Sequence, residues 1–202
     1  ARDIARKSMV LLKNDGLLPL PKTIKTLAVI GPNANDGRNQ LGDYSYVVMR
    51  QLMQLKAPEN SAFLDMKMDE LAKYEVKVTT VLEGIRFAVS PEAKILYARG
   101  CDNLSNDRSG FDEAVSVAKR AEAVVLVLGD HSGLTPECTT GETRDSADLK
   151  LPGIQEDLAK AILATGKPVA AVLINGRPSP FPSLAEHSNA ILESLLTGEE
   201  VG

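Results

Sequence analysis

The side chains with the clearest capacity for chemistry lie in a loop of residues 130–153. This loop follows an apolar run, AVVLVLG (123–129), and precedes an amphipathic stretch, IQEDLAKAILA (154–164). Its ionisable residues include Glu137, Glu142, Arg144, Asp145 and Asp148. Two carboxyl groups that flank a bond can act as proton donor and as nucleophile or base, provided that one stays protonated near neutral pH.

Glu142 is the carboxylate in this loop that best fits a proton-transfer role. It comes directly after the flexible Gly141, and Arg144 and Asp145 lie within three residues of it. Burial or a neighbouring carboxylate would hold such a side chain in its protonated form. Spacing alone favours a solvated loop with an ion pair, because charged surface clusters are common and most contribute little. Acid–base catalysis therefore stays open as the alternative.

Composition excludes several classes of function. The 202-residue chain has a net charge of −4, whereas a nucleic-acid-binding surface is normally basic and clustered. No apolar run approaches the roughly 20 residues that span a membrane. Cys101 and Cys138 lack C-x-x-C spacing, so we expect two free thiols and no structural zinc site.

Short apolar runs alternate with segments of helical periodicity. The runs at 26–31, 94–100, 123–129 and 168–176 are typical of strands buried on both faces. Segments 80–90, 111–121 and 154–162 are predicted helices, and the opening stretch 1–14 also has a helical pattern. We interpret 47–77 as a loop or helical excursion. This alternation predicts an α/β fold with an open, mostly parallel sheet.

The turns after the predicted strands should share one edge of that sheet. They follow Gly31, Gly100, Gly129 and Asn175, and ligands of open α/β sheets bind at the carboxyl ends of the strands. The loop that carries Glu142 follows one of these strands. We therefore expect Glu142 near this edge.

Two other chemistries lack their motifs. GPNANDGR (31–38) matches neither G-x-G-x-x-G nor a Walker loop, and turn formation accounts for its asparagines. A serine hydrolase would need G-x-S-x-G after a strand, and the chain contains none. We expect His131 and His187 to be ordinary polar residues.

The order of motifs along the chain resembles the C-terminal α/β-sandwich domain of glycoside hydrolase family 3, which includes β-glucosidases and β-xylosidases. The resemblance covers nearly all 202 residues. It rests on ARKSMVLLKNDGLLPLPK, TLAVIGPNAND, LGDYSY, TVLEGIR, YARGCD, AVVLVLGDHSGLTPECTTGETRD, LKLPGIQEDLAKAI, TGKPVAAVLINGRP and AILESLLTGEE, in this order. The resemblance implies a three-layer α/β/α sandwich with a mostly parallel sheet.

The resemblance also implies how the chain is divided and what surrounds it. Residues 1–25 would lead in from a TIM-barrel domain of the same polypeptide, and 26–202 would form the sandwich domain, truncated at its C-terminal end. The barrel would supply the nucleophilic aspartate. Without the barrel, the fragment is expected to be inactive. No cofactor, metal, nucleic acid or membrane partner is implied, and the compartment is left open.

By position, Glu142 in GETRD matches the acid/base glutamate of the family, and Glu137 is the second choice. Arg144 and Asp145 would bind substrate or support the loop. The family is retaining and exo-acting, so the implied substrate is a β-glucoside or a related oligosaccharide, with β-glucosidase favoured. A carbohydrate-binding or structural domain without a catalytic role is the alternative.

Some positions depart from the pattern of the family. Ser146 stands where arginine is common, and Leu195, Thr197 and Val201 stand where tryptophan, proline and glycine are common. Arg144 supplies a charge similar to that of the arginine that Ser146 replaces.

Overall fold

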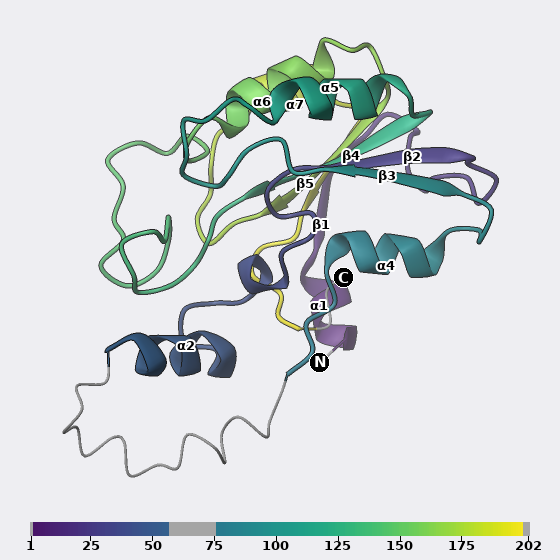
Figure 1. Cartoon of the computed structure of the whole chain (residues 1–202). Helices are drawn as coiled ribbons and strands as arrows, with labels where there is room; N and C mark the ends of the chain where they lie inside the picture. The colour runs from purple at the N-terminus through teal and green to yellow at the C-terminus, as the bar shows by residue number, and fades with distance from the viewer. Residues whose placement is uncertain (1, 57–75, 200–202) are drawn as a thin grey trace.

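The computed structural model describes residues 2–56 and 76–199, and it forms a six-stranded sheet (Figure 1). From one edge to the other, the strands are β1 (Val10–Asn14), β6 (Ala190–Glu193), β5 (Val169–Ile174), β4 (Ala123–Gly129), β2 (Thr26–Ile30) and β3 (Lys94–Ala98). Only β1 runs antiparallel to its neighbour, and the other pairs are parallel. The predicted mostly parallel sheet is thus confirmed.

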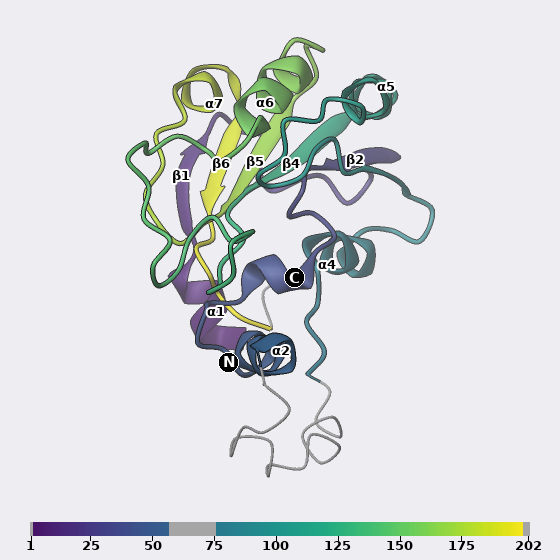
Figure 2. The ribbon, with the colours of Figure 1, turned by 60° about the vertical axis from the view of Figure 1, so that its left-hand side comes forward.

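Helices cover both faces of the sheet. Helices α5 (Phe111–Lys119), α6 (Gln155–Leu163) and α7 (Pro182–His187) lie over one face, and α4 (Val81–Ala88) lies on the other (Figures 1 and 2). The chain therefore has the predicted three-layer α/β/α architecture. Two further helices, α1 (Arg2–Ser8) and α2 (Tyr46–Lys56), lie below the sheet in Figure 1, as does the short 3-10 helix η1 (Gly37–Gln40).

The alternation of side chains along each central strand builds two cores. In β4, Leu126 and Leu128 pack with the core under α5 and α6, whereas Val125 and Val127 pack with the core on the α4 side. Every residue of β4 is buried. Successive side chains of a strand point to opposite faces, so a continuous apolar run suits a strand that is covered on both sides.

Glycine ends two central strands because of close backbone packing. Gly129 has φ +140°, and a Cβ placed there would lie 1.8 Å from the carbonyl oxygen of Ile174 on β5. Gly31 has φ +127°, and a Cβ there would lie 2.0 Å from the Val127 carbonyl oxygen. Only glycine fits both restrictions, so these residues direct the chain away from the sheet at its carboxyl edge.

Most predicted elements are confirmed, namely the four strands and the helices at 80–90, 111–121 and 154–162. The helical prediction for 1–14 is wrong after Ser8, because Val10–Asn14 pairs antiparallel with β6, a strand about 180 residues away in the sequence. Within 47–77, α2 accounts for the residues up to Lys56, and 57–75 lie outside the described residues. No helix in the described part of the chain is long and apolar enough to cross a membrane.

The packing of α6 on the sheet predicts that truncation of Leu158 strongly lowers the stability of the domain. Leu158 is fully buried, whereas Leu149 in the preceding loop is 57% exposed. We expect Leu158→Ala to lower the free energy of unfolding by about 2–5 kcal/mol, and Leu149→Ala to change it by less than about 0.5 kcal/mol. Urea denaturation of the 202-residue chain measures both, and equal effects would contradict the packing of α6.

Candidate active site

The loops that follow four parallel strands meet at one edge of the sheet, as predicted. Asn33, after β2, donates from Nδ2 to the carbonyl oxygens of Asp130 (3.1 Å) and Ile174 (3.3 Å). Asn103, after β3, donates from Nδ2 to the Gly129 carbonyl oxygen at 3.0 Å. These contacts join the ends of β2, β3, β4 and β5.

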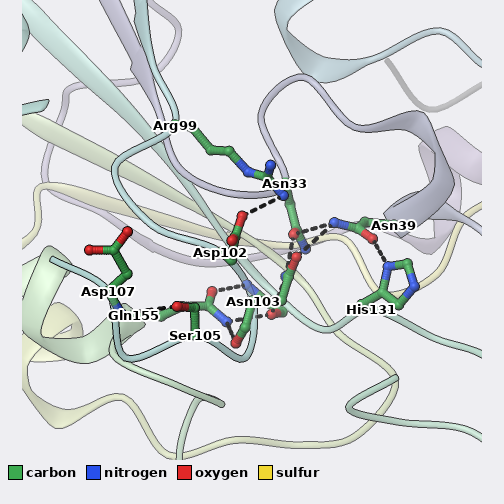
Figure 3. Close-up of polar contacts among 10 residues, drawn as sticks. Asn33, Asn39, Arg99, Asp102, Asn103, Ser105, Asp107, His131 and Gln155 are labelled. Atoms are coloured by element: carbon green, nitrogen blue, oxygen red, sulfur yellow. Dashed lines mark hydrogen bonds and ion pairs between the residues drawn. The ribbon is translucent and has the colours of Figure 1, made fainter. Parts of the chain in front are cut away.

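Four buried amide side chains form the centre of this edge, and we call them the amide cluster: Asn33, Asn39, Asn103 and Gln155. Asn39 Nδ2 donates to the Oδ1 atoms of Asn33 (2.8 Å) and Asn103 (3.1 Å), and Asn103 Nδ2 donates to Asn33 Oδ1 at 2.7 Å (Figure 3). Each amide both donates and accepts, so these side chains, together with the adjacent backbone and His131, are satisfied without a charge.

Gln155 pairs with the backbone at the point where β4 ends. Its Oε1 accepts the Gly129 N–H at 2.8 Å, and its Nε2 donates to the Gly129 carbonyl oxygen at 2.8 Å. The same Nε2 donates to the Asn103 carbonyl oxygen at 3.2 Å. The first residue of α6 thereby satisfies backbone groups that β4 leaves unpaired as it leaves the sheet.

His131 links the amide cluster to the loop of residues 130–153. Burial lowers the pKa of His131, and the nearby Arg38 guanidinium lowers it further, so the imidazole is neutral at neutral pH. Its Nδ1 lies 2.5 Å from Asn39 Oδ1. An amide oxygen only accepts, so Nδ1 carries the proton and donates it to Asn39 (Figure 3). His187, in contrast, is exposed at the end of α7.

The base of the loop is closed by Asp130 and Arg177. The Asp130 carboxylate accepts the Thr139 hydroxyl at 2.7 Å and the Gly176 N–H at 3.0 Å. Arg177 Nη2 donates to the carbonyl oxygens of Thr139 (2.6 Å) and Arg144 (2.7 Å). The strand ends therefore hold both sides of the loop, although its outer residues are exposed.

Glu142 lies exposed on this loop, in a tight turn. Gly141 before it has φ +126°, and a Cβ there would lie 2.4 Å from the Gly133 carbonyl oxygen. The Glu142 N–H donates to Asp43 Oδ2 at 3.0 Å, and its carboxylate accepts a hydrogen bond from the Tyr44 hydroxyl. Another loop thus holds both the carboxylate (through Tyr44) and the backbone (through Asp43) of Glu142, which spacing along the sequence did not indicate.

Glu137 has a different environment. Its Oε1 accepts the Thr135 hydroxyl at 2.6 Å, and its side chain is exposed. This hydrogen bond, followed by one from its own backbone N–H, lowers the pKa of Glu137, because both stabilise the carboxylate. Glu137 is therefore held in its ionised form.

Arg144 and Asp145 line a cleft of about 470 Å³ beside the loop. Neither Glu142 nor Glu137 lines it, although Thr143, next to Glu142, does. The other charged side chains that line the cleft are those of Asp130, Asp148, Lys150 and Arg177. Ser146, at a position where arginine was expected, donates from its hydroxyl to the Asp148 carbonyl oxygen at 2.5 Å.

Several residues of this edge were missed in the sequence. Asn33 and Asn39 fall in GPNANDGRNQ, directly after a predicted strand, and Arg177 follows another. The predicted convergence of these loops was the signal that could have found them.

Cys101 and Cys138 are free and buried. Among the described residues, no group of three or more His, Cys, Asp or Glu side chains is arranged to hold a metal ion.

Comparison with known proteins assigns this domain to a class. The family model described as the glycosyl hydrolase family 3 C-terminal domain matches residues 9–202. A β-xylosidase of Formosa agariphila is 42% identical over all of this chain, and a periplasmic β-glucosidase of Salmonella typhimurium is 34% identical over all of it. The chain spans 25% of the length of each.

A solved structure agrees with these relatives. A β-glucosidase from Listeria innocua in complex with isofagomine superposes with a TM-score of 0.74 at 26% identity, covering 100% of this chain and 23% of the other. The three-layer fold and its matched sequence thus define a domain of a glycoside hydrolase. The chain belongs to the C-terminal domain of glycosyl hydrolase family 3.

The amide cluster predicts that substitution of Asn103 lowers the stability of the domain, whereas substitution of Asn106 in the same loop changes it little. Asn103 is 7% exposed and bonded to two other amides, whereas Asn106 in the same loop is exposed. We expect Asn103→Ala to lower the free energy of unfolding by about 1–3 kcal/mol, because it leaves buried polar groups unpaired. Asn106→Ala should change it by less than about 0.5 kcal/mol. Chemical denaturation measures both, and a neutral Asn103→Ala would contradict the cluster.

Proposed function

We propose that this chain is the acid/base-bearing domain of a retaining, exo-acting β-glycosidase, with Glu142 as the acid/base. The nucleophile would come from an N-terminal TIM-barrel domain of the same polypeptide, outside residues 1–202. Membership of the family supports the reaction class. The observation that carries the assignment of the residue is the exposed Glu142, whose carboxylate is held by Tyr44 and whose backbone N–H is held by Asp43, beside the carboxyl edge of the sheet.

In this proposal Glu142 acts twice. In the first step its carboxyl group protonates the leaving glycosidic oxygen while the nucleophile attacks the anomeric carbon and forms a glycosyl-enzyme intermediate. In the second step the Glu142 carboxylate removes a proton from the water that hydrolyses this intermediate. An exposed position suits both steps, because the group must reach first a substrate oxygen and then a water molecule.

The environment of Glu137 supports Glu142 over this second choice. A general acid must carry a proton when substrate binds. The lowered pKa of Glu137 favours its ionised form, which counts against it as a proton donor.

The sugar is proposed to be a terminal, non-reducing β-D-glucosyl residue, with a β-D-xylosyl residue as the second candidate. The relative named periplasmic β-glucosidase supports the first. The 42% identity to a protein named β-xylosidase supports the second. The ratio of kcat/KM for p-nitrophenyl β-glucoside and β-xyloside, measured on the full-length parent enzyme, separates them.

A non-catalytic, carbohydrate-binding role is the competing function. The cleft beside the loop favours it, because the arginine and carboxylate side chains there could bind sugar hydroxyls without any contribution from Glu142. Substitution of Glu142 in the parent enzyme distinguishes the two functions, since binding in the cleft does not require this carboxylate.

We expect Glu142→Gln in the full-length parent to lower kcat/KM on an aryl β-glycoside by roughly 10²–10⁴-fold, because general acid catalysis is lost. Glu137→Gln is the matched control and should change it by less than about threefold, as a surface substitution without a role in the reaction. Azide should restore turnover to Glu142→Ala by attacking the glycosyl-enzyme without a general base. Near-normal activity of Glu142→Gln would leave only binding or support, and collapse of Glu137→Gln instead would transfer the acid/base role to Glu137.

The fragment alone should be inactive, because retaining hydrolysis needs two carboxyl groups and the nucleophile is assigned to the barrel. We expect purified 1–202 to release no p-nitrophenol above buffer from β-glucoside or β-xyloside. Turnover that Glu142→Gln abolishes would overturn the requirement for a second domain. Turnover that Glu142→Gln leaves intact would reveal a contaminating hydrolase.

A further inference from the structure

We propose that Tyr44 and Asp43 are positioning residues for Glu142. The Tyr44 hydroxyl donates to Glu142 Oε2, and Asp43 Oδ2 accepts the Glu142 backbone N–H at 3.0 Å. One contact orients the carboxyl group and the other holds the backbone of the same residue. This inference rests on the proposed role of Glu142.

The segment that carries Asp43 and Tyr44 is anchored on buried groups. Just before it, η1 places Asn39 in the amide cluster, and Leu41 is 1% exposed. The Ser45 N–H donates to the Gly42 carbonyl oxygen at 3.0 Å and closes a turn around both residues. Helix α2 then begins at Tyr46. Asp43 and Tyr44 thus lie between a buried anchor and a helix start.

The amide cluster holds this segment and the Glu142 loop in a common frame. Asn39 bonds to Asn33 and Asn103 on one side and to His131, in the loop of Glu142, on the other. The contacts of Asp43 and Tyr44 with Glu142 join the same two loops a second time, at their exposed ends. Two loops about 100 residues apart in sequence are therefore joined at their base and at their tip.

The chemistry of Glu142 gives these contacts their consequence. An exposed glutamate samples many rotamers, and few of them present its carboxyl group to a substrate oxygen. The Tyr44 hydroxyl holds Oε2, which leaves Oε1 to carry the proton and deliver it. Alignment of a proton donor with the atom that it protonates is a large part of the rate that an enzyme gains from proximity.

Tyr44→Phe tests the positioning role because it removes only the hydroxyl. The Tyr44 side chain is 64% exposed, so little packing depends on it, and the thermal unfolding midpoint should be unchanged. Poor leaving groups need protonation and good ones do not. A misaligned acid therefore slows a phenyl β-glycoside far more than a 2,4-dinitrophenyl β-glycoside with the same sugar.

In the full-length parent, Tyr44→Phe should lower kcat/KM for the phenyl glycoside by about tenfold, the effect of losing one hydrogen bond. For the dinitrophenyl glycoside, kcat/KM should fall by less than about twofold, because its leaving group needs no protonation. Tyr97→Phe is the matched control, because Tyr97 lies on β3 against the α4-side core, and it should leave the ratio of the two substrates unchanged. Asp43→Asn, which keeps an accepting oxygen, should retain more activity on the phenyl glycoside than Asp43→Ala.

Glu142→Gln measured on the same two substrates separates failure of this inference from failure of the proposed function. If Glu142→Gln discriminates strongly between the leaving groups and Tyr44→Phe does not, the positioning role is overturned and the role of Glu142 stands. If Glu142→Gln has the wild-type ratio, both are overturned. Equal losses on both substrates in Tyr44→Phe would assign Tyr44 a general structural effect and would also overturn the inference.

Discussion

The unpaired backbone at the carboxyl edge of the sheet is the constraint on which the rest of this structure depends. A parallel sheet buried on both faces must satisfy N–H and carbonyl groups where its strands end, away from water. Here Gly31 and Gly129 turn the chain out of the sheet, and side-chain amides take over as hydrogen-bond partners. Asn33, Asn103 and Gln155 occupy the positions where ladder partners are missing.

Neutral amides can satisfy these backbone groups without burying a charge. Burial of an unpaired charge costs several kcal/mol in desolvation. An amide supplies donors and an acceptor and is neutral, so it avoids this penalty. The cluster can therefore join four strand ends, and then extend through Asn39 to His131, without a counter-ion. The neutral imidazole continues the same logic, because its lowered pKa removes a charge that the buried edge would have to stabilise.

The central strands and the helices that cover them could be predicted from sequence, because their signals are local. An apolar run such as 123–129 and the spacing of Leu158 and Ile162 each report burial within a single element. Strand β1 carries no such signal, since Val10, Leu11 and Leu12 are about half exposed and its assignment depends on pairing with β6. The convergence of four loops also followed from sequence, because parallel connectivity requires it. The identity of the contacts at that edge did not, since an asparagine that caps a turn and one that joins two strands look alike in sequence.

The candidate site shows the same division between local and long-range information. Glu142 could be singled out through its loop and a family resemblance, and Arg144 and Asp145 were assigned to substrate binding or loop support from their positions beside it. Gly141 and Thr143, on either side of Glu142, have φ values of +126° and +61° and form a tight turn before Arg144 and Asp145. Arg144 and Asp145 consequently line a cleft that Glu142 does not, while Asp43 and Tyr44, about 100 residues away, contact Glu142 directly. In a tight turn, residues two or three apart point in different directions, so proximity along the chain is a poor guide to which side chains act together. Contacts between loops that are anchored on one buried cluster are a better guide, because the anchor restricts how far either loop can move relative to the other.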